Sequence, residues 1–266
     1  IRVIMPETLE QSALDKIAST IPRGVEIVGL GGGAVIDAAK YFAYLKDKTP
    51  LLIPTITSSN APFSDFISVR KGGGPFGFKK DGWPKKIIVD YELIRKADPR
   101  LNRAGYGDLL FMQTTLNDWR IAAASGKGVP LDSEVEENMV KMIEHAIDNA
   151  EEIGLVTDQG IKKLMELTEK STSLVMSNLS KPISAGAEHL FAWNLEIQTG
   201  RNFIHGEIVS LGIVIASFLQ KNDHTKLKQA LDKAQVIYLP DQLGIDWDEV
   251  EQCLLTVKSY NRKVRR

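Results

Sequence analysis

The stretch VEIVGLGGGAVIDAAK, residues 25–40, joins an apolar run to three consecutive glycines and then to a helical pattern. The apolar run predicts a buried strand over residues 25–30, and the spacing after the glycines predicts a helix over residues 34–45. A strand, a glycine turn and a helix in this order can bind an anion, because N–H groups at the helix start face the turn. Glycines also allow a tight bend with no ligand, so both interpretations stay open here.

The glycine spacing does not match the two common phosphate motifs. It fits G-x-G-x-x-G poorly, and no Lys-Ser or Lys-Thr pair follows the glycines as a Walker motif requires. A phosphate-binding role therefore depends on the strand-turn-helix context, not on the glycine spacing.

Strand-like and helix-like segments alternate up to about residue 100. Further strands are expected over residues 51–54 and 87–90, and a further helix over residues 9–20. Strands separated by helices imply parallel βαβ units, so we predict a Rossmann-like α/β domain over residues 1–102. Within it, Phe66–Val69 and Phe76–Phe78 flank the run KGGGP, residues 71–75, which predicts a hairpin turn.

Beyond residue 102 the sequence shows helical periodicity only, which predicts an all-α helical-bundle domain over residues 103–266. Apolar residues recur at helical spacing over residues 134–153, behind a Ser133 expected to cap that helix. Further helices are expected over residues 160–179, 185–199, 206–219 and 225–234.

Composition excludes several classes of protein. The 266 residues carry a formal net charge of −1, which gives no reason to expect nucleic acid or an anionic membrane as a partner. No apolar run reaches the ~20 residues that span a bilayer. The single cysteine, Cys253, cannot form an internal disulfide, and no signal peptide is recognisable. We therefore expect a cytoplasmic protein that acts on a small molecule.

Histidine is scarce, and two of the four histidines have unusual surroundings. His189 lies inside an expected helix, in SAGAEHLFAW, and His205 opens the next one, in NFIHGEIVSLG. Asp108, in RAGYGDLLFMQTTLNDW, is expected at the start of another helix. Two imidazoles and one carboxylate with open positions form a catalytic metal set. A core or capping role is the alternative for each histidine.

Several of these segments together resemble the iron-containing alcohol dehydrogenase and dehydroquinate synthase superfamily, most closely its glycerol-1-phosphate dehydrogenases. GLGGGAVIDAAKYFAY is similar to the cofactor turn of that family, and IPTITSSNAPFSD to its next cofactor and substrate loop. AGYGDLLFMQTTLNDWRIA, AGAEHLFAW and FIHGEIVSLG are similar to the segments that supply an aspartate and two histidine metal ligands. These segments occur in the same order as in the family, and the resemblance covers nearly the whole chain.

The resemblance implies a dehydroquinate synthase-like fold and a set of site residues. Asp108, His189 and His205 would be the metal ligands and the catalytic residues. NAD or NADP would place its pyrophosphate on the glycine turn and touch the next loop, and Asn60 would contact substrate. The implied cofactor-binding residues are Gly31, Gly32, Gly33, Asp37, Thr55, Thr57 and Ser58. Ordinary turn chemistry is the alternative for the hydroxyl residues. Zinc is the first choice for the single divalent metal, with iron or nickel as alternatives.

The implied function is a metal-dependent, NAD(P)-linked dehydrogenase that interconverts a small polyol phosphate and its ketone. Glycerol 1-phosphate and dihydroxyacetone phosphate are the first pair to test, and a homo-oligomer is implied by the family. The metal would act as a Lewis acid on the alcohol or ketone, and the nicotinamide would exchange the hydride.

Three departures from the family pattern keep alternatives open. The strand-helix unit that usually precedes the point matching Ile1 is expected to be missing; Asn60 stands where relatives carry aspartate, and Met112 where they carry lysine. A dehydrogenase for glycerol or another unphosphorylated polyol is one alternative. A cyclase or lyase that uses NAD transiently, like dehydroquinate synthase, is a second, and a non-catalytic homologue is a third. Side chains that either bind a substrate phosphate or are solvated charges are Lys181, Arg201 and Lys221.

Overall fold

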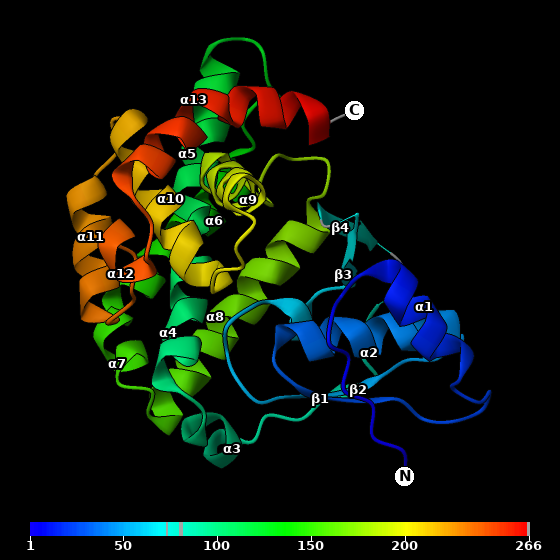
Figure 1. Ribbon diagram of the computed structural model, residues 1–266. Helices are drawn as coiled ribbons and strands as arrows, with labels where there is room; N and C mark the ends of the chain where they lie inside the picture. Colours follow the sequence, from blue (N-terminus) through cyan, green and yellow to red (C-terminus); the bar gives the residue numbers. More distant parts are fainter. Residues whose placement is uncertain (73, 80–81, 265–266) are drawn as a thin grey trace.

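The computed structural model describes residues 1–72, 74–79 and 82–264. It consists of an N-terminal α/β part that lies beside a larger helical part (Figure 1). The α/β part is drawn in blue and cyan, and the helices that follow run from green to red. The fold class expected from the sequence is confirmed.

A small parallel sheet forms the centre of the α/β part. Its strands are β1 (Val28–Gly31), β2 (Leu51–Pro54) and β5 (Lys86–Ile87), in the order β1-β2-β5. Helix α2 (Gly33–Leu45) connects β1 to β2 and packs on the sheet. Because the two strands it joins are parallel, this is the βαβ unit that the sequence predicts.

Two strand predictions need correction. The first strand begins at Val28, not at residue 25, and its side chains are not all buried: Val28 and Leu30 are 51% and 56% exposed. Strand β1 lies at the sheet edge, and α2 covers the face toward which Gly29 points. The third strand ends at Ile87 instead of residue 90, because the Asp90 side chain caps helix α3 (Tyr91–Lys96).

The predicted hairpin is present beside this sheet. Strands β3 (Phe66–Lys71) and β4 (Gly74–Lys79) pair antiparallel, with Lys71 opposite Gly74. Gly73, which the sequence places in the turn, lies outside the described residues. Helix α1 (Gln11–Ser19) packs on both α2 and β3, and a short 3₁₀ turn, η1 (Ala61–Phe63), precedes the hairpin.

The helical part is built around α10, whose apolar side chains are buried on almost every face. Helix α10 packs against α9, α4 and α5, and these helices share the largest apolar core of the described chain. The helices of the helical part are α4 (Pro99–Leu109), α5 (Phe111–Ala124), α6 (Ser133–Asp148), α7 (Ala150–Gly154), α8 (Asp158–Ser177), α9 (Ala187–Thr199), α10 (His205–Leu219), α11 (His224–Lys233), α12 (Pro240–Leu243) and α13 (Trp247–Val264). The domain boundary expected after residue 102 stays a proposal, and it would fall within α4.

The expected helix over residues 134–153 is two helices in the structure. Helix α6 ends at Asp148, and α7 begins at Ala150. Its expected cap was also wrong by one residue: the Asp132 side chain accepts a 3.2 Å hydrogen bond from the backbone N–H of Val135, and Ser133 is the first helical residue. A carboxylate at this position satisfies an N–H group that the helix itself leaves unpaired.

Within the described ranges, no helix has the combination of length and apolar composition that crossing a bilayer requires.

Candidate metal and cofactor site

The glycine turn forms the junction between β1 and α2. Gly32 is the N-cap of α2 and Gly33 its first residue, and no described side chain caps this end of the helix. A Cβ atom on Gly33 would stand 2.6 Å from Oγ of Ser59, so the loop after β2 lies directly over the turn. The arrangement leaves first-turn N–H groups of a long helix for a ligand, as anion binding requires.

The loop after β2 is fastened to the helical part by Asn102 of α4. The Thr57 backbone N–H donates to Oδ1 of Asn102 at 2.9 Å, and the Thr57 hydroxyl donates to its backbone oxygen at 3.1 Å. Thr57 is therefore buried against α4, whereas Thr55 and Ser58 are half-buried and Asn60 is exposed. Among the loop residues predicted to bind cofactor or substrate, Thr57 has the most extensive protein contacts.

Asp37 lies on the buried face of α2, away from the open end of the helix. One of its oxygens accepts a 3.1 Å hydrogen bond from the Ser68 backbone N–H. The neighbouring Lys40 is fully buried, and its ammonium donates to the carbonyl oxygens of Ala61, Ser64 and Phe66. These two side chains hold the segment that precedes and opens the hairpin, so the contacts of Asp37 in the structure are with protein.

Asp108, His189 and His205 converge although each comes from a different helix. Their potential ligand atoms all lie within 4.8 Å of one another. Oδ1 of Asp108 is 3.5 Å from Nε2 of His189 and 3.6 Å from Nε2 of His205. Asp108 lies in the last turn of α4, which corrects the expectation that it opens a helix. His189 lies in the first turn of α9 and His205 opens α10, as the sequence predicts.

Two glycines permit the close approach that brings these side chains together. A Cβ atom on Gly206 would stand 1.8 Å from the carbonyl oxygen of Ala104, so α10 touches the backbone of α4 directly. A Cβ atom on Gly105 would stand 1.8 Å from the carbonyl oxygen of Thr57. Any larger residue would separate these backbones, because contacts below 3 Å are strongly repulsive.

A second buried carboxylate lies behind His189. Oε1 of Glu188 is 2.8 Å from Nδ1 of His189, and Glu188 is fully buried. Glu188 is not recognisable as a site residue from the sequence. Adjacent residues of a helix normally point in different directions, so their spacing carries no sign of this contact.

Charge interactions couple the three converging groups. Burial opposes ionisation of Asp108, but the imidazoles of His205 and His189 outweigh it and lower the pKa of Asp108. Burial lowers the pKa of His189, but the carboxylates of Asp108 and Glu188 outweigh it and raise that pKa to about 9. For His205 burial prevails, and its pKa is lowered. The three groups therefore titrate as one coupled cluster.

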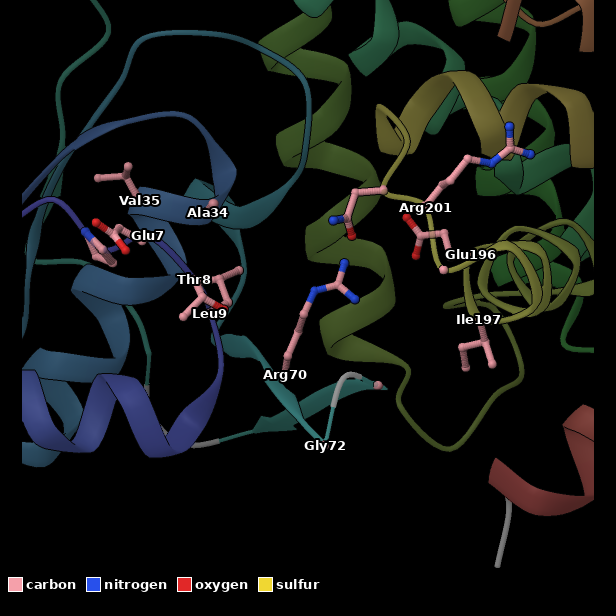
Figure 2. Close-up of a pocket in the computed structure, with 14 residues that line it drawn as sticks. Glu7, Thr8, Leu9, Ala34, Val35, Arg70, Gly72, Glu196, Ile197 and Arg201 are labelled. Atoms are coloured by element: carbon pink, nitrogen blue, oxygen red, sulfur yellow. The ribbon is translucent and has the colours of Figure 1, made fainter. Parts of the chain in front are cut away.

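A cavity of about 760 Å³ opens between the α/β part and the helical part. One wall holds the start of α2, with Ala34 and Val35, and the other holds the end of α9 and residues 200–202, which lead into His205. Figure 2 shows Arg70 reaching from β3 toward the helical part, with Glu196 and Arg201 on the opposite wall. Arg70 and Glu196 are not recognisable as site residues from the sequence, because their proximity depends on how the two parts pack.

Comparisons with known proteins identify the family of this chain. Residues 2–98 match the family model for iron-containing alcohol dehydrogenases. A glycerol-1-phosphate dehydrogenase [NAD(P)+] of Sulfurisphaera tokodaii is 33% identical over 240 residues, which cover 90% of this chain and 67% of that protein. The corresponding enzyme of Aeropyrum pernix is 31% identical over 256 residues, covering 96% of this chain and 71% of the enzyme.

This chain belongs to the iron-containing alcohol dehydrogenase family.

Solved structures share the fold of this alcohol dehydrogenase family member over nearly the whole chain. A probable glycerol dehydrogenase from Sinorhizobium meliloti superposes with a TM-score of 0.77 at 20% identity, covering 96% of this chain and 75% of that one. Glycerol dehydrogenase from Schizosaccharomyces pombe gives a TM-score of 0.72 at 19% identity, covering 98% of this chain and 76% of that one. At such identities the likeness establishes the fold alone.

The converging side chains of this family member fit a divalent metal. Two imidazoles and one carboxylate, half-buried or buried and within reach of one another, match the donor set that catalytic zinc, iron or nickel sites use. The buried carboxylate behind His189 is the partner that metal-binding histidines usually have.

The three basic residues considered for a substrate phosphate, and Met112, differ in whether they line the cavity. Arg201 lines the cavity, but its guanidinium also pairs with Glu249 at 2.6 Å. Lys181 pairs with Asp132, Lys221 follows the end of α10, and neither lines the cavity. Met112, where the resemblance to the family leads us to expect lysine, is buried in the helical core.

Proposed function

We propose that this protein is a metal-dependent, NAD(P)-linked dehydrogenase that interconverts sn-glycerol 1-phosphate and dihydroxyacetone phosphate. The observation that carries this proposal is the convergence of Asp108, His189 and His205 from three helices, with their ligand atoms within 4.8 Å of one another. The relatives that are about 30% identical along most of the chain are glycerol-1-phosphate dehydrogenases, and this supports the choice of reaction.

The two parts of the chain would have different roles. Asp108, His189 and His205 would hold the metal, and Gly31–Gly33 with the open end of α2 would bind the pyrophosphate of the coenzyme. When bound, the cation supplies a Lewis acid for the alcohol or ketone and the nicotinamide exchanges the hydride. The cavity is lined by Ala34 and Val35, which follow the glycine turn, and by residues 200–202, which precede His205. Its volume is in the range of small-molecule and cofactor sites.

Thr55, Ser58 and Asn60 are proposed to contact the coenzyme and the substrate. They lie on the loop that covers the glycine turn, and Thr57 fixes this loop to α4, the helix that carries Asp108. Thr57 would therefore set the distance between coenzyme and metal ligands more than it would contact the coenzyme itself. Asp37 would act in the same indirect way, through the segment that it holds together with Lys40.

Arg70 favours a phosphorylated substrate over an unphosphorylated polyol. Its guanidinium lines the cavity and lies close enough to His205 to lower the pKa of that imidazole. An arginine recognises phosphate through several N–H donors in fixed geometry, which a neutral hydroxyl cannot use fully. The replacement of lysine by Met112 does not weigh against phosphate here, because Met112 faces the apolar core.

We also propose that the protein forms the homo-oligomer that the family implies.

The test is a coenzyme-oxidation assay with two substrates. Zinc-loaded protein is given NADH or NADPH with dihydroxyacetone phosphate or with dihydroxyacetone, and the enantiomer of the product is determined. We expect oxidation with dihydroxyacetone phosphate, and sn-glycerol 1-phosphate as the product. Preference for dihydroxyacetone would contradict the substrate, and phosphate release without net coenzyme oxidation would indicate a cyclase or lyase instead.

A further inference from the structure

Glu188 occupies an unusual place for a carboxylate. It lies in the first turn of α9, is 0% exposed, and directly precedes His189 in the sequence. Burying a carboxylate is unfavourable unless hydrogen bonds replace its lost water. The contacts of Glu188 therefore show what the protein gains from keeping it there.

Four donors surround the two oxygens of Glu188. Oε2 accepts from the Thr114 hydroxyl at 2.6 Å, and Oε1 accepts from the Thr115 hydroxyl at 3.2 Å and from the Gly186 backbone N–H at 2.7 Å. Nδ1 of His189 lies 2.8 Å from Oε1. A carboxylate offers acceptors only, so Nδ1 of His189 must carry the proton of this hydrogen bond.

This bond fixes which nitrogen of His189 faces the site. In a neutral imidazole with a protonated Nδ1, Nε2 has a free lone pair. Nε2 is the atom that lies 3.5 Å from Oδ1 of Asp108, and this separation is longer than a normal hydrogen bond. A lone pair that faces a carboxylate at this distance is repulsive, so the space between the two atoms favours a positive charge: a proton on Nε2 in the metal-free protein, or a metal cation in its place.

The charges of the site lead to the same conclusion. Asp108 and Glu188 are both buried or nearly so, and together they carry two negative charges beside two imidazoles. A divalent cation brings the formal charge of this group to zero. The Thr114 and Thr115 hydroxyls and the Gly186 N–H keep the inner carboxylate in place, so it does not need to approach the cation itself.

We propose that Glu188 is a positioning residue for the metal: it holds His189 in the tautomer whose Nε2 binds the cation, and it supplies the second negative charge of a neutral site. The proposal rests on the proposed metal-dependent function. It assigns to Glu188 a role in metal affinity that is separate from its packing in α9.

The test compares zinc affinity among matched variants, measured by competition with a chromogenic chelator. Glu188→Gln keeps one acceptor oxygen but loses the charge, and Glu188→Met loses both. We expect Glu188→Gln to bind zinc about 10-fold more weakly and Glu188→Met about 100-fold more weakly, which is the usual range for partners of metal-binding histidines.

Glu207 provides the control. It is a buried carboxylate two residues after His205, but both of its oxygens accept from the Arg100 guanidinium, at 2.7 and 2.8 Å. Glu207→Gln and Glu207→Met should change zinc affinity less than about 3-fold, because they leave the imidazoles untouched. Equal losses at Glu207 and Glu188 would show that any buried charge on these helices matters alike, and would overturn the proposal.

A measurement on the unmutated protein keeps the proposal testable if variants misfold. Two-bond ¹⁵N–¹H spectra of the zinc-loaded protein should show Nδ1 of His189 protonated and Nε2 bound to the metal. The opposite tautomer would overturn the role of Glu188. Unmutated protein that binds none of zinc, iron and nickel would overturn the proposed function and this inference with it, whereas tight zinc binding that Glu188→Met leaves unchanged would overturn the inference alone.

Discussion

Nε2 of His205 lies 3.6 Å from Oδ1 of Asp108, and the backbones that carry these side chains touch one residue further along α10. There, a Cβ atom on Gly206 would stand 1.8 Å from the carbonyl oxygen of Ala104 in α4. The distance between the two proposed ligands is thus set by direct contact of two helix backbones.

Gly206→Ala should separate these helices and loosen the site. The added methyl group must displace α10 from α4, and overpacking of this kind typically destabilises a protein by about 1 to 3 kcal/mol. We expect a lower free energy of unfolding and weaker zinc binding, measured by urea denaturation and chelator competition. Gly77→Ala is the control, since the nearest atom to its Cβ lies at 4.0 Å. Unchanged zinc affinity in Gly206→Ala would contradict the dependence of the site on this contact.

Removing a proposed ligand should abolish metal binding without unfolding the chain. Asp108→Ala and His205→Ala each delete one of three donors, and two remaining donors hold a divalent ion far more weakly. Elemental analysis should find the variants metal-free, activity should be lost, and circular dichroism should match the unmutated protein. His145→Ala, which deletes an exposed histidine of α6, should keep metal and activity. A ligand variant that retains full metal-dependent turnover would show that the ligands are wrongly assigned.

Much of this architecture could be predicted from the sequence, and the exceptions have physical reasons. The strand-turn-helix within residues 25–45 and most of the helices after residue 103 follow from local periodicity, although the strand begins only at Val28. The exposure of Val28 and Leu30 could not be predicted from periodicity, because an apolar run looks the same in a covered strand and at a sheet edge. Where a strand ends also depends on single side chains, such as Asp90, that cap the next helix.

For the site, the three converging residues could be predicted, but the contacts that support them could not. The resemblance supplies Asp108, His189 and His205, and the structure brings these three together; their role as ligands stays a prediction. The roles of Asn102, Lys40 and Glu188 in the structure depend on contacts with other segments or on side-chain direction, which the spacing of residues does not encode. Asp37 illustrates the difference: the family resemblance implies a role in cofactor binding, and the structure shows its carboxylate accepting a hydrogen bond from the Ser68 backbone.

Arg70→Met should change substrate preference. Hydrogen bonds between charged groups are worth about 1.5 to 3 kcal/mol, so losing them should raise KM for dihydroxyacetone phosphate roughly 10- to 100-fold. KM for dihydroxyacetone should change little, because that molecule has no phosphate. The control is Arg95→Met, at an exposed arginine that pairs with Asp158 away from the cavity. Equal changes of KM for both substrates would contradict a phosphate contact by Arg70.

Asp37 should make the stability of the protein depend on pH. Burial raises its pKa from 3.8 to about 6, against the opposing effects of Lys40 and the Ser68 N–H. Since the folded state holds the proton more tightly than the unfolded state, the contribution of Asp37 is complete below about pH 4 and is lost as pH rises to about 6.

The measurement is the free energy of unfolding of metal-free protein between pH 4 and 7, compared with Asp37→Asn. The difference between the two proteins should change by at most about 1.4 kcal/mol per pH unit, with the unmutated chain losing stability relative to the variant as pH rises. The amide of the variant can still accept from the Ser68 N–H, so the comparison isolates the proton. A difference that is independent of pH would contradict a raised pKa.

The most direct measurement is the titration of zinc into metal-free protein while the oxidation of NADH or NADPH by dihydroxyacetone phosphate is followed. The account predicts no oxidation without metal, a linear rise on addition of zinc, and a break at one zinc per chain. Oxidation that proceeds fully in the metal-free protein, or that ignores added zinc, iron and nickel alike, would contradict it.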